Sequence, residues 1–308
     1  MIRHEPTPSN DPPQGRRRFG RGARRLRAVA VLPTLFTLGN LVCGFFAIAV
    51  TSRIHKPETA ETPITQSIFQ QQSWSLDSAD PTHNMMLAGW LIFIAMIFDA
   101  LDGHVARLTK ASSQFGAQLD SLCDAVTFGV APGLLLVKMV PSFEYYYPGA
   151  VWIIAAVYAS CAVLRLARFN VETGENDDHS TFQGLPSPAA AASIAGFAIL
   201  FYTLRVEKPE YEWKRSVDTA VQHLLPFFAL IVALLMVSRI PYPHLVNRIF
   251  RGKKSFGHLV GLIFGIVAIA MIRGYAVPIV SCAFVLGPLL MFAWKRWREP
   301  EPATESLF

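Results

Sequence analysis

Four aspartates stand close together in a stretch that long apolar runs border on both sides. Asp99 and Asp102 lie three residues apart, and Asp120 and Asp124 lie four apart. Spacings of three and four place side chains on one face of a helix. The run MMLAGWLIFIAMIF precedes the first pair, and VTFGVAPGLLLV follows the second. The pattern therefore predicts two antiparallel helices that bring four carboxylates together at the edge of a hydrocarbon environment.

Such a cluster needs cations. A charged side chain at the centre of a membrane helix costs about 2.5–3.5 kcal/mol on insertion scales, and neighbouring like charges repel each other. Arg107 is the nearest Lys or Arg to the first pair, and it cannot balance four carboxylates alone. Divalent ions that prefer oxygen ligands, such as Mg²⁺ or Mn²⁺, can do so. Metal-assisted catalysis is one interpretation of the cluster. An ion or proton pathway in a transporter and purely structural pairing are the alternatives.

The composition indicates a membrane protein. The chain has 308 residues, of which 52% are hydrophobic and 16% are charged, whereas soluble domains carry about 25% charged residues. Apolar runs recur from residue 32 to residue 294 without a soluble-type interruption. Cys43, Cys123, Cys161 and Cys282 all fall in or beside these runs, without the close spacing of a zinc site. The predicted fold class is an all-α, polytopic membrane helix bundle.

About 20 mainly apolar residues are needed to span a bilayer, and eight segments qualify. They are 32–51, 85–106, 117–137, 149–168, 188–204, 222–238, 257–272 and 275–294. Placing both termini in the cytoplasm puts 20 of the 28 Lys and Arg residues on that side, as the positive-inside rule expects. The aspartates then lie at the cytoplasmic face of the cell (inner) membrane.

The predicted domain organisation is one membrane domain over residues 31–296, with a polar tail at each end. Residues 1–30 read as a basic, mostly disordered cytoplasmic tail that rests against anionic headgroups. Because this tail directly precedes a membrane helix, lipid is favoured over nucleic acid as its partner. Residues 297–308 read as a second cytoplasmic tail.

Small residues accompany the carboxylates on the same helix faces. Gly103 and Ala106 follow the first pair, and Gly116 precedes the second. Small side chains leave room for a bulky ligand, although they also permit close helix packing. The spacing alone leaves both explanations open.

The whole stretch resembles the signature of the CDP-alcohol phosphatidyltransferase family, with every specified position matched. The pattern is Asp99-x2-Asp102-Gly103-x2-Ala106-Arg107-x8-Gly116-x3-Asp120-x3-Asp124. The resemblance implies transfer of a phosphatidyl group from CDP-diacylglycerol to an alcohol, with release of CMP. It implies that the four aspartates hold divalent metal, Mg²⁺ or Mn²⁺ and two ions in number, and that Asp124 is also the general base. The CDP-lipid would contact Asp102, Gly103, Ala106, Arg107 and Gly116.

Four further segments are similar to those of family members that use L-serine as the acceptor. They are LPTLFTLGNLVCGFFAI (32–48), LRLARFNV (164–171), FQGLPSPAAA (182–191) and LLMVSRIPYP (234–243). One departure is Thr34, where many relatives have Asn after the proline. The resemblance implies L-serine as the second substrate and a homodimer embedded in membrane lipid.

The same segments supply candidate contacts for the acceptor. Arg165 and Arg168 lie on one helix face and could bind a carboxylate or a phosphate, and Asn170 could add a hydrogen bond. Thr37 and Asn40 are candidate contacts from the first helix. Glycerol 3-phosphate, inositol and inositol phosphate stay open as alternative acceptors, although a phosphorylated acceptor favours a denser basic cluster. A transporter is disfavoured because the carboxylates lie at one edge and the chain shows no internal repeat of the motif.

Overall fold

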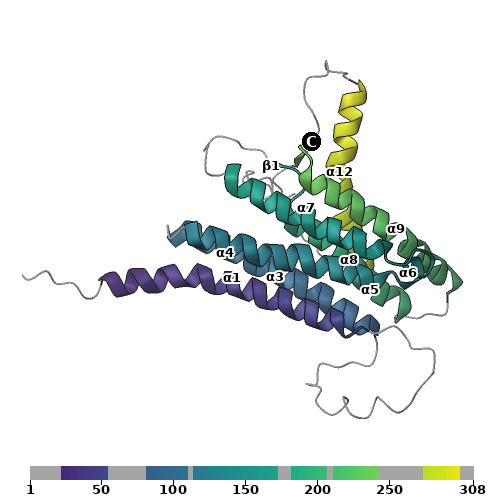
Figure 1. The fold of residues 1–308 in the computed structure, drawn as a ribbon, viewed down its shortest axis with the longest axis horizontal. Coiled ribbons are helices and arrows are strands. Elements are labelled where there is room, and N and C mark those ends of the chain that lie inside the picture. The colour runs from purple at the N-terminus through teal and green to yellow at the C-terminus, as the bar shows by residue number, and fades with distance from the viewer. Residues whose placement is uncertain are drawn as a thin grey trace, which may run out of the picture.

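The computed structural model describes residues 22–54, 81–109, 114–172, 182–206, 211–242 and 273–298. Long helices in these ranges lie side by side as a bundle (Figure 1). The helices are α1 (Gly22–Ser52), α3 (Pro81–Thr109), α4 (Gln114–Asp124), η1 (Ala125–Val130), α5 (Ala131–Met139), α6 (Pro141–Tyr146), α7 (Ala150–Glu172), α8 (Ser187–Arg205), α9 (Glu212–Val237), η2 (Arg273–Tyr275) and α12 (Ala276–Arg298). The strands β1 (Phe182–Gln183) and β2 (Pro241–Tyr242) form one short antiparallel pair.

Seven helical segments in the described ranges are long and apolar enough to cross a membrane. They coincide with seven of the eight predicted spans, and α4, η1 and α5 together form one of them, Gln114–Met139. The eighth predicted span, 257–272, lies outside the described residues. The predicted all-α membrane bundle is confirmed.

Several helices begin earlier than the apolar runs predicted. The helix α1 begins at Gly22, so residues 22–30 of the predicted disordered tail are helical. Pro33, which the predicted span 32–51 would place in the first turn, lies inside the helix. The helix α9 begins at Glu212, ten residues before the predicted start. An apolar run marks only the part of a helix that lies within the hydrocarbon core of the membrane. Arg, Lys, Glu and Leu are good helix formers and extend the backbone beyond it.

The third span contains a π-helical segment, η1, that directly follows Asp124. Pro132 near the start of α5 has no N–H, so the carbonyl of Phe128, four residues earlier, loses its α-helical donor. The hydroxyl of Tyr158 on α7 donates to that carbonyl at 3.3 Å. The irregular backbone is thereby satisfied inside the bundle, and single π turns of this kind often occur at functional sites.

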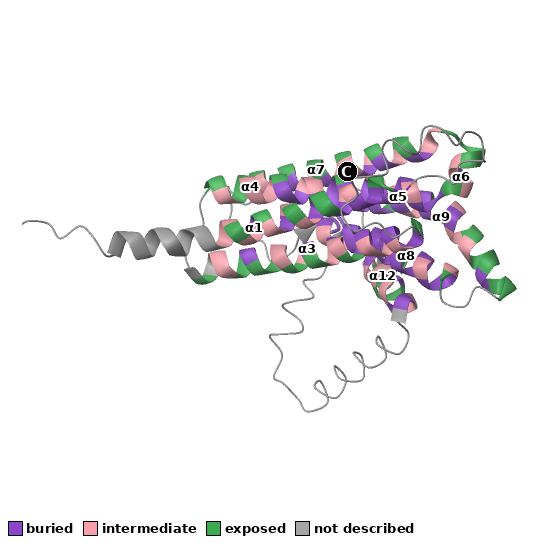
Figure 2. Cartoon of the chain, turned by 90° about the horizontal axis from the view of Figure 1, so that it is seen from below, coloured by how far each residue is buried: buried purple, intermediate pink, exposed green. Residues whose placement is uncertain are grey.

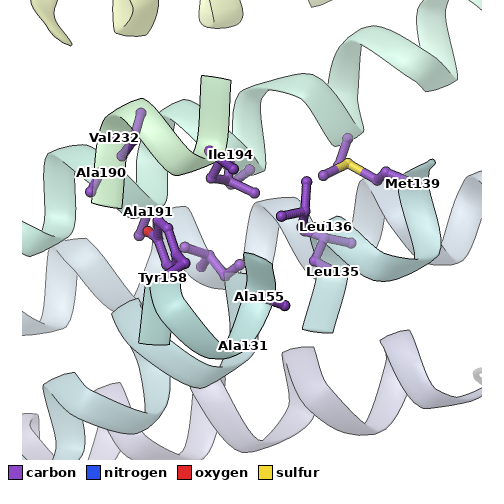
Figure 3. Packing of buried hydrophobic residues seen from close by; sticks show 14 of the residues in the cluster. Ala131, Leu135, Leu136, Met139, Ala155, Tyr158, Ala190, Ala191, Ile194 and Val232 are labelled. Atoms are coloured by element: carbon purple, nitrogen blue, oxygen red, sulfur yellow. The ribbon is translucent and has the colours of Figure 1, made fainter. Parts of the chain in front are cut away.

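The core lies where α5, α7, α8 and α9 meet (Figure 2). The helix α8 is the most buried of the seven spans, because its Ala-rich sequence lets neighbouring backbones approach closely. Figure 3 shows Ala190, Ala191 and Ile194 of α8 packed among Tyr158 and Val232 of the adjoining helices. This packed centre holds the outer helices, including those that carry the aspartates.

Candidate active site

The two aspartate pairs come together between α3 and α4. Asp99, Asp120 and Asp124 can each present one carboxylate oxygen such that these atoms all lie within 4.8 Å of one another. Asp99 and Asp120 are half-buried, and the side chain of Asp124 is only 7% exposed. Oxygen atoms at this mutual distance can share one or two hard divalent cations.

Asp102 is the fourth member of the cluster, and it is 5% exposed. Its carboxylate lies beside that of Asp120 and beside the hydroxyl of Thr37 on α1. One oxygen of each carboxylate, Oδ2 of Asp102 and Oδ1 of Asp120, is buried and has no hydrogen-bond partner among the described residues. Buried polar atoms are rarely left without a partner, and a cation would complete these two.

The cluster is not neutralised by protein cations in the part of the chain that the structure describes. No described Lys or Arg side chain forms an ion pair with any of the four carboxylates. Four mutually repelling charges in a poorly hydrated site are unfavourable without counter-charge. The donor set, the separation and the two buried oxygens together fit divalent metal, with Asp99, Asp102, Asp120 and Asp124 as the residues that would hold it.

Asp124 is held in place by the first helix. The side-chain amide of Asn40, which is 0% exposed, donates to Oδ1 of Asp124 at 2.8 Å. The hydroxyl of Thr127 on η1 donates to the backbone carbonyl of Asn40 at 3.3 Å. Gly44 allows this contact, because a Cβ there would collide with the Thr127 side chain. Asn40, a predicted substrate contact, is thus a direct partner of a carboxylate.

The predicted CDP-lipid residues line the ends of the same two helices. A Cβ built on Gly103 would meet no atom of the described residues within 4 Å, so their packing does not require glycine there. Ala106 and Gly116 are half-buried. Arg107 lies on the last turns of α3, and its side chain is outside the described part of the structure. The sequence pattern allowed Gly103 to serve either ligand binding or helix packing, and the open space beside it favours ligand binding.

Arg165, Arg168 and Asn170, the predicted acceptor contacts outside the first helix, lie on α7, which runs to Glu172 and is longer than predicted. Arg165 donates to the hydroxyl of Ser187 at 3.4 Å, and Arg168 donates to the backbone carbonyl of Val237 at 2.9 Å. The amide of Asn170 donates to the hydroxyl of Ser121, next to Asp120, at 2.9 Å. These residues therefore connect α7 to α8, to the end of α9 and to α4.

Three of the segments that pointed to serine meet at this place. Gly184 and Leu185 donate backbone hydrogen bonds to Ile240 and Leu235, and β1 pairs with β2. Gly184 has φ of +82°, and a Cβ there would lie 2.6 Å from the Met236 carbonyl oxygen. Only glycine suits both conditions. The segments 164–171, 182–191 and 234–243 thus form one interconnected structure beside the aspartates.

Sequence reasoning missed the residues that hold others in place. Thr127 supports Asn40, Ser121 contacts Asn170, and Ser187 contacts Arg165. Thr127 had a usable signal, because it lies three residues after Asp124 and so near the same helix face. Ser187 lies in the segment 182–191 that resembled the serine-using relatives, but nothing in the sequence pointed to Arg165 as its partner.

The chain is similar to several curated proteins. "CDP-diacylglycerol–serine O-phosphatidyltransferase" of Helicobacter pylori is 30% identical over 221 residues, which are 70% of this chain and 81% of the relative. Proteins of the same name from Methanocaldococcus jannaschii and Mycobacterium bovis are 36% and 38% identical. Their matches cover 52% of this chain in both cases, and 65% and 52% of the respective relatives.

The profile of the family described as CDP-alcohol phosphatidyltransferase matches residues 30–238. This range contains the aspartate cluster, the Asn40 and Thr127 contacts and the meeting point of α7, α8 and α9. The match extends over most of the chain, and the geometry of the site agrees with it. The chain therefore belongs to the CDP-alcohol phosphatidyltransferase family.

Proposed function

We propose that this chain transfers a phosphatidyl group from CDP-diacylglycerol to the hydroxyl of L-serine, giving phosphatidylserine and CMP, with a divalent metal bound. The observation that carries the proposal is the cluster of Asp99, Asp120 and Asp124, whose oxygens lie within 4.8 Å of one another in a membrane chain. A purely structural role does not account for this cluster, because its charges have no described ionic partner.

The aspartates would hold Mg²⁺ or Mn²⁺. The family resemblance implies that two ions bind. Metal bound there supplies counter-charge for the pyrophosphate of the CDP-lipid and for the leaving CMP. The open space beside Gly103 gives the nucleotide room against the α3 backbone. Arg107, on the same helix, is the residue proposed to add a fixed positive charge to the phosphates.

Asp124 is proposed as the general base. It would take the proton of the serine hydroxyl while the serine oxygen forms a bond to the lipid-side phosphorus and the bond from that phosphorus to the CMP oxygen breaks. The hydrogen bond from Asn40 to Oδ1 orients the carboxylate and leaves its other oxygen for the proton. Direct attack is favoured over a covalent intermediate, because Ser121 is engaged with Asn170 and Cys123 is only 1% exposed.

Serine is favoured as the acceptor by the three segments that meet beside the cluster and by the names of the relatives. Arg165 and Arg168, both on α7, are proposed to bind the serine carboxylate or a lipid phosphate. Their contacts with Ser187 and with the Val237 carbonyl hold them in place. Asn170 and Thr37 are proposed as weaker contributors to this side of the site.

The chain is proposed to lie in the cell (inner) membrane with the active site facing the cytoplasm, where serine and CMP are dissolved. The distribution of Lys and Arg supports this orientation. Homodimerisation is proposed from the family resemblance alone.

The test is CMP release by purified protein in detergent with CDP-diacylglycerol. Serine, glycerol 3-phosphate and inositol are supplied separately, with Mg²⁺, with Mn²⁺ or with EDTA. We expect release with serine only, abolished by EDTA and restored by added metal. Asp124→Asn is the matched control, since an Asn side chain can still accept the bond from Asn40. Its turnover should fall by about 10²–10⁴-fold, while metal-dependent nucleotide binding partly persists.

Each other outcome has a defined meaning. CMP release with another alcohol but not with serine would support the proposed reaction and show that serine is not the acceptor. Normal turnover by Asp124→Asn would remove Asp124 as the base, and a trapped phosphatidyl-enzyme adduct would overturn direct attack. No release with any acceptor from folded protein would contradict the proposed function.

A further inference from the structure

A cavity of about 230 Å³ lies at the end of the bundle opposite the aspartate cluster. Its lining comes from the ends of α1, α3, α5 and α8 and from α6 and the start of α7, and includes Ile54, Met85, Lys138, Glu144, Trp152 and Arg205. In Figure 1 the labels α5 and α6 stand at this end, and α4 stands at the other. The cavity combines an apolar wall with charged groups and takes no part in the proposed reaction.

The cavity lies at the opposite membrane interface. Pro81 at the start of α3 lines it, and Asp99 follows 18 residues later on the same helix. At a rise of about 1.5 Å per residue, the two positions are about 27 Å apart along the helix axis. This separation is close to the hydrocarbon thickness of a bilayer, about 30 Å. If the aspartates lie at one interface, the cavity lies at the other.

Aromatic side chains mark the same level. Tyr145, Tyr146 and Tyr147 follow each other at the end of α6, and Trp152 and Trp213 stand at the starts of α7 and α9. All five side chains are more than half exposed. Exposed Tyr and Trp gather at the headgroup level of membrane proteins. The cavity therefore opens among lipid headgroups.

The charges in the cavity are of both signs and are not paired with each other. Glu144 accepts one bond from the backbone of Gly149, but its Oε2 is buried without a hydrogen-bond partner among the described residues. Lys138 donates to the carbonyl of Ile54 at 2.8 Å, and an ammonium group has three donors. Arg205 forms an ion pair with Asp218, which balances its charge. Among the described residues that line the cavity, one cation (Lys138) and one anion (Glu144) remain for a ligand.

We propose that this cavity binds the headgroup of an aminophospholipid from the membrane leaflet opposite the active site. The lipid phosphate accepts from the ammonium of Lys138, and the lipid amine donates to Oε2 of Glu144. The apolar side chains of Ile54, Met85 and Trp152 contact the glycerol and the first acyl carbons. The site is separate from catalysis, and its occupation stabilises the packing of α1, α3, α5 and α8 at this end.

The choice of an amine-bearing headgroup follows from the Glu144 oxygen. A phosphatidylglycerol headgroup has no positive charge to place beside this carboxylate. A choline headgroup has a positive charge but no N–H to donate to it. A primary amine supplies both the charge and the donor. Free phosphoethanolamine has the same headgroup without acyl chains, so it separates recognition of the headgroup from that of the lipid.

The test titrates dioctanoyl phosphatidylethanolamine into the delipidated chain in detergent. Binding is measured as the shift of the thermal unfolding midpoint at each lipid concentration. Dioctanoyl phosphatidylglycerol, dioctanoyl phosphatidylcholine and phosphoethanolamine are the comparison ligands. We expect the midpoint to rise most with the ethanolamine lipid. Glu144→Gln and Lys138→Gln should each weaken its apparent affinity by about 10-fold or more, as the loss of a charge-assisted hydrogen bond predicts.

Matched controls are available on the same end of the molecule. Glu212→Gln and Arg215→Gln change the same charges at exposed positions of α9 and should leave the affinity unchanged. CMP release by all four variants, with CDP-diacylglycerol and serine in detergent that contains no ethanolamine lipid, checks that they fold. Equal affinity of the Glu144 variant and the parent chain, or an equal response to the glycerol lipid, would overturn the proposal. If phosphoethanolamine raised the unfolding midpoint as much as the ethanolamine lipid does, the proposed contacts of Ile54, Met85 and Trp152 with the glycerol and acyl carbons would be contradicted.

Discussion

Asp124 shows how a single carboxylate obtains its orientation from another helix. Its Oδ1 accepts from Asn40, which is fully buried and lies 84 residues earlier in the chain. Asn40 in turn is fixed through its carbonyl by Thr127. At the residue scale, the orientation of the proposed base therefore depends on the position of α1.

Asn40→Ala should lower kcat by about 10- to 100-fold, because a hydrogen bond to a charged group contributes about 1.5–3 kcal/mol. The KM for the CDP-lipid should change little, since Asn40 acts through Asp124. Steady-state CMP release over a range of lipid concentrations measures both quantities. Thr127→Ser, which retains the hydroxyl, is the control. An increase in KM with unchanged kcat would show that Asn40 contacts the substrate instead.

Gly103 offers a second test at this scale. Gly103→Ala should stabilise the free protein by up to about 1 kcal/mol, because alanine favours a helix over glycine and the space is open. The same change should raise the KM for the CDP-lipid by about tenfold, which corresponds to about 1.4 kcal/mol of lost binding. Gly287→Ala on α12, also in open space, is the matched control. Unchanged KM in Gly103→Ala would mean that no ligand group lies there.

At the scale of elements, the contact between α1 and the π-helical segment decides the shape of the site. Gly44 faces Thr127, and the irregular turn of η1 follows directly after Asp124. Pro132 and the hydroxyl of Tyr158 sustain that turn from the other side. The third span is therefore a support for the aspartates rather than a plain membrane helix.

Gly44→Ala should push α1 and η1 apart. The new Cβ would collide with Oγ1 of Thr127 and lie about 3 Å from its Cβ and Cα, and overpacking of this kind costs about 1–3 kcal/mol. We expect a lower unfolding midpoint together with loss of CMP release. Adding Thr127→Ala should recover part of the stability but little activity, since the Asn40 contact stays broken. A Gly44 variant with the parent's stability would show that the two elements separate freely.

At the scale of the whole molecule, the number of spans sets where the termini lie. The seven described spans alone would place the termini on opposite sides, whereas the predicted eighth span, 257–272, returns the C-terminus to the side of the N-terminus. The distribution of Lys and Arg favours the second arrangement.

A protease-accessible tag at either terminus should therefore be protected in intact spheroplasts and cleaved after lysis. A tag inserted between residues 55 and 80 should be cleaved in both conditions, because that segment is predicted to lie outside. Cleavage of only one terminal tag in intact spheroplasts would establish an odd number of spans. Cleavage of both would invert the orientation and place the aspartates outside.

The sequence by itself determined the class of protein and the identity of the carboxylates. Both depend on local patterns: apolar runs of membrane-spanning length, and Asp pairs at helical spacing such as Asp120 and Asp124. It also predicted where the spans lie, although not where α1 and α9 begin, because polar helix ends carry no apolar signal. Arg165 and Arg168 were recognised as candidates without their partners.

Only the tertiary structure decided which residues meet across helices. The bond from Asn40 to Asp124, the contact of Arg168 with the Val237 carbonyl and the pairing of β1 with β2 join segments far apart in the chain. So does the cavity that contains Lys138 and Glu144. Spacing along one helix fixes which side chains share a face, but the partner of that face depends on how the whole bundle packs. That packing follows from small residues such as Gly44, whose effect appears only when two helices touch.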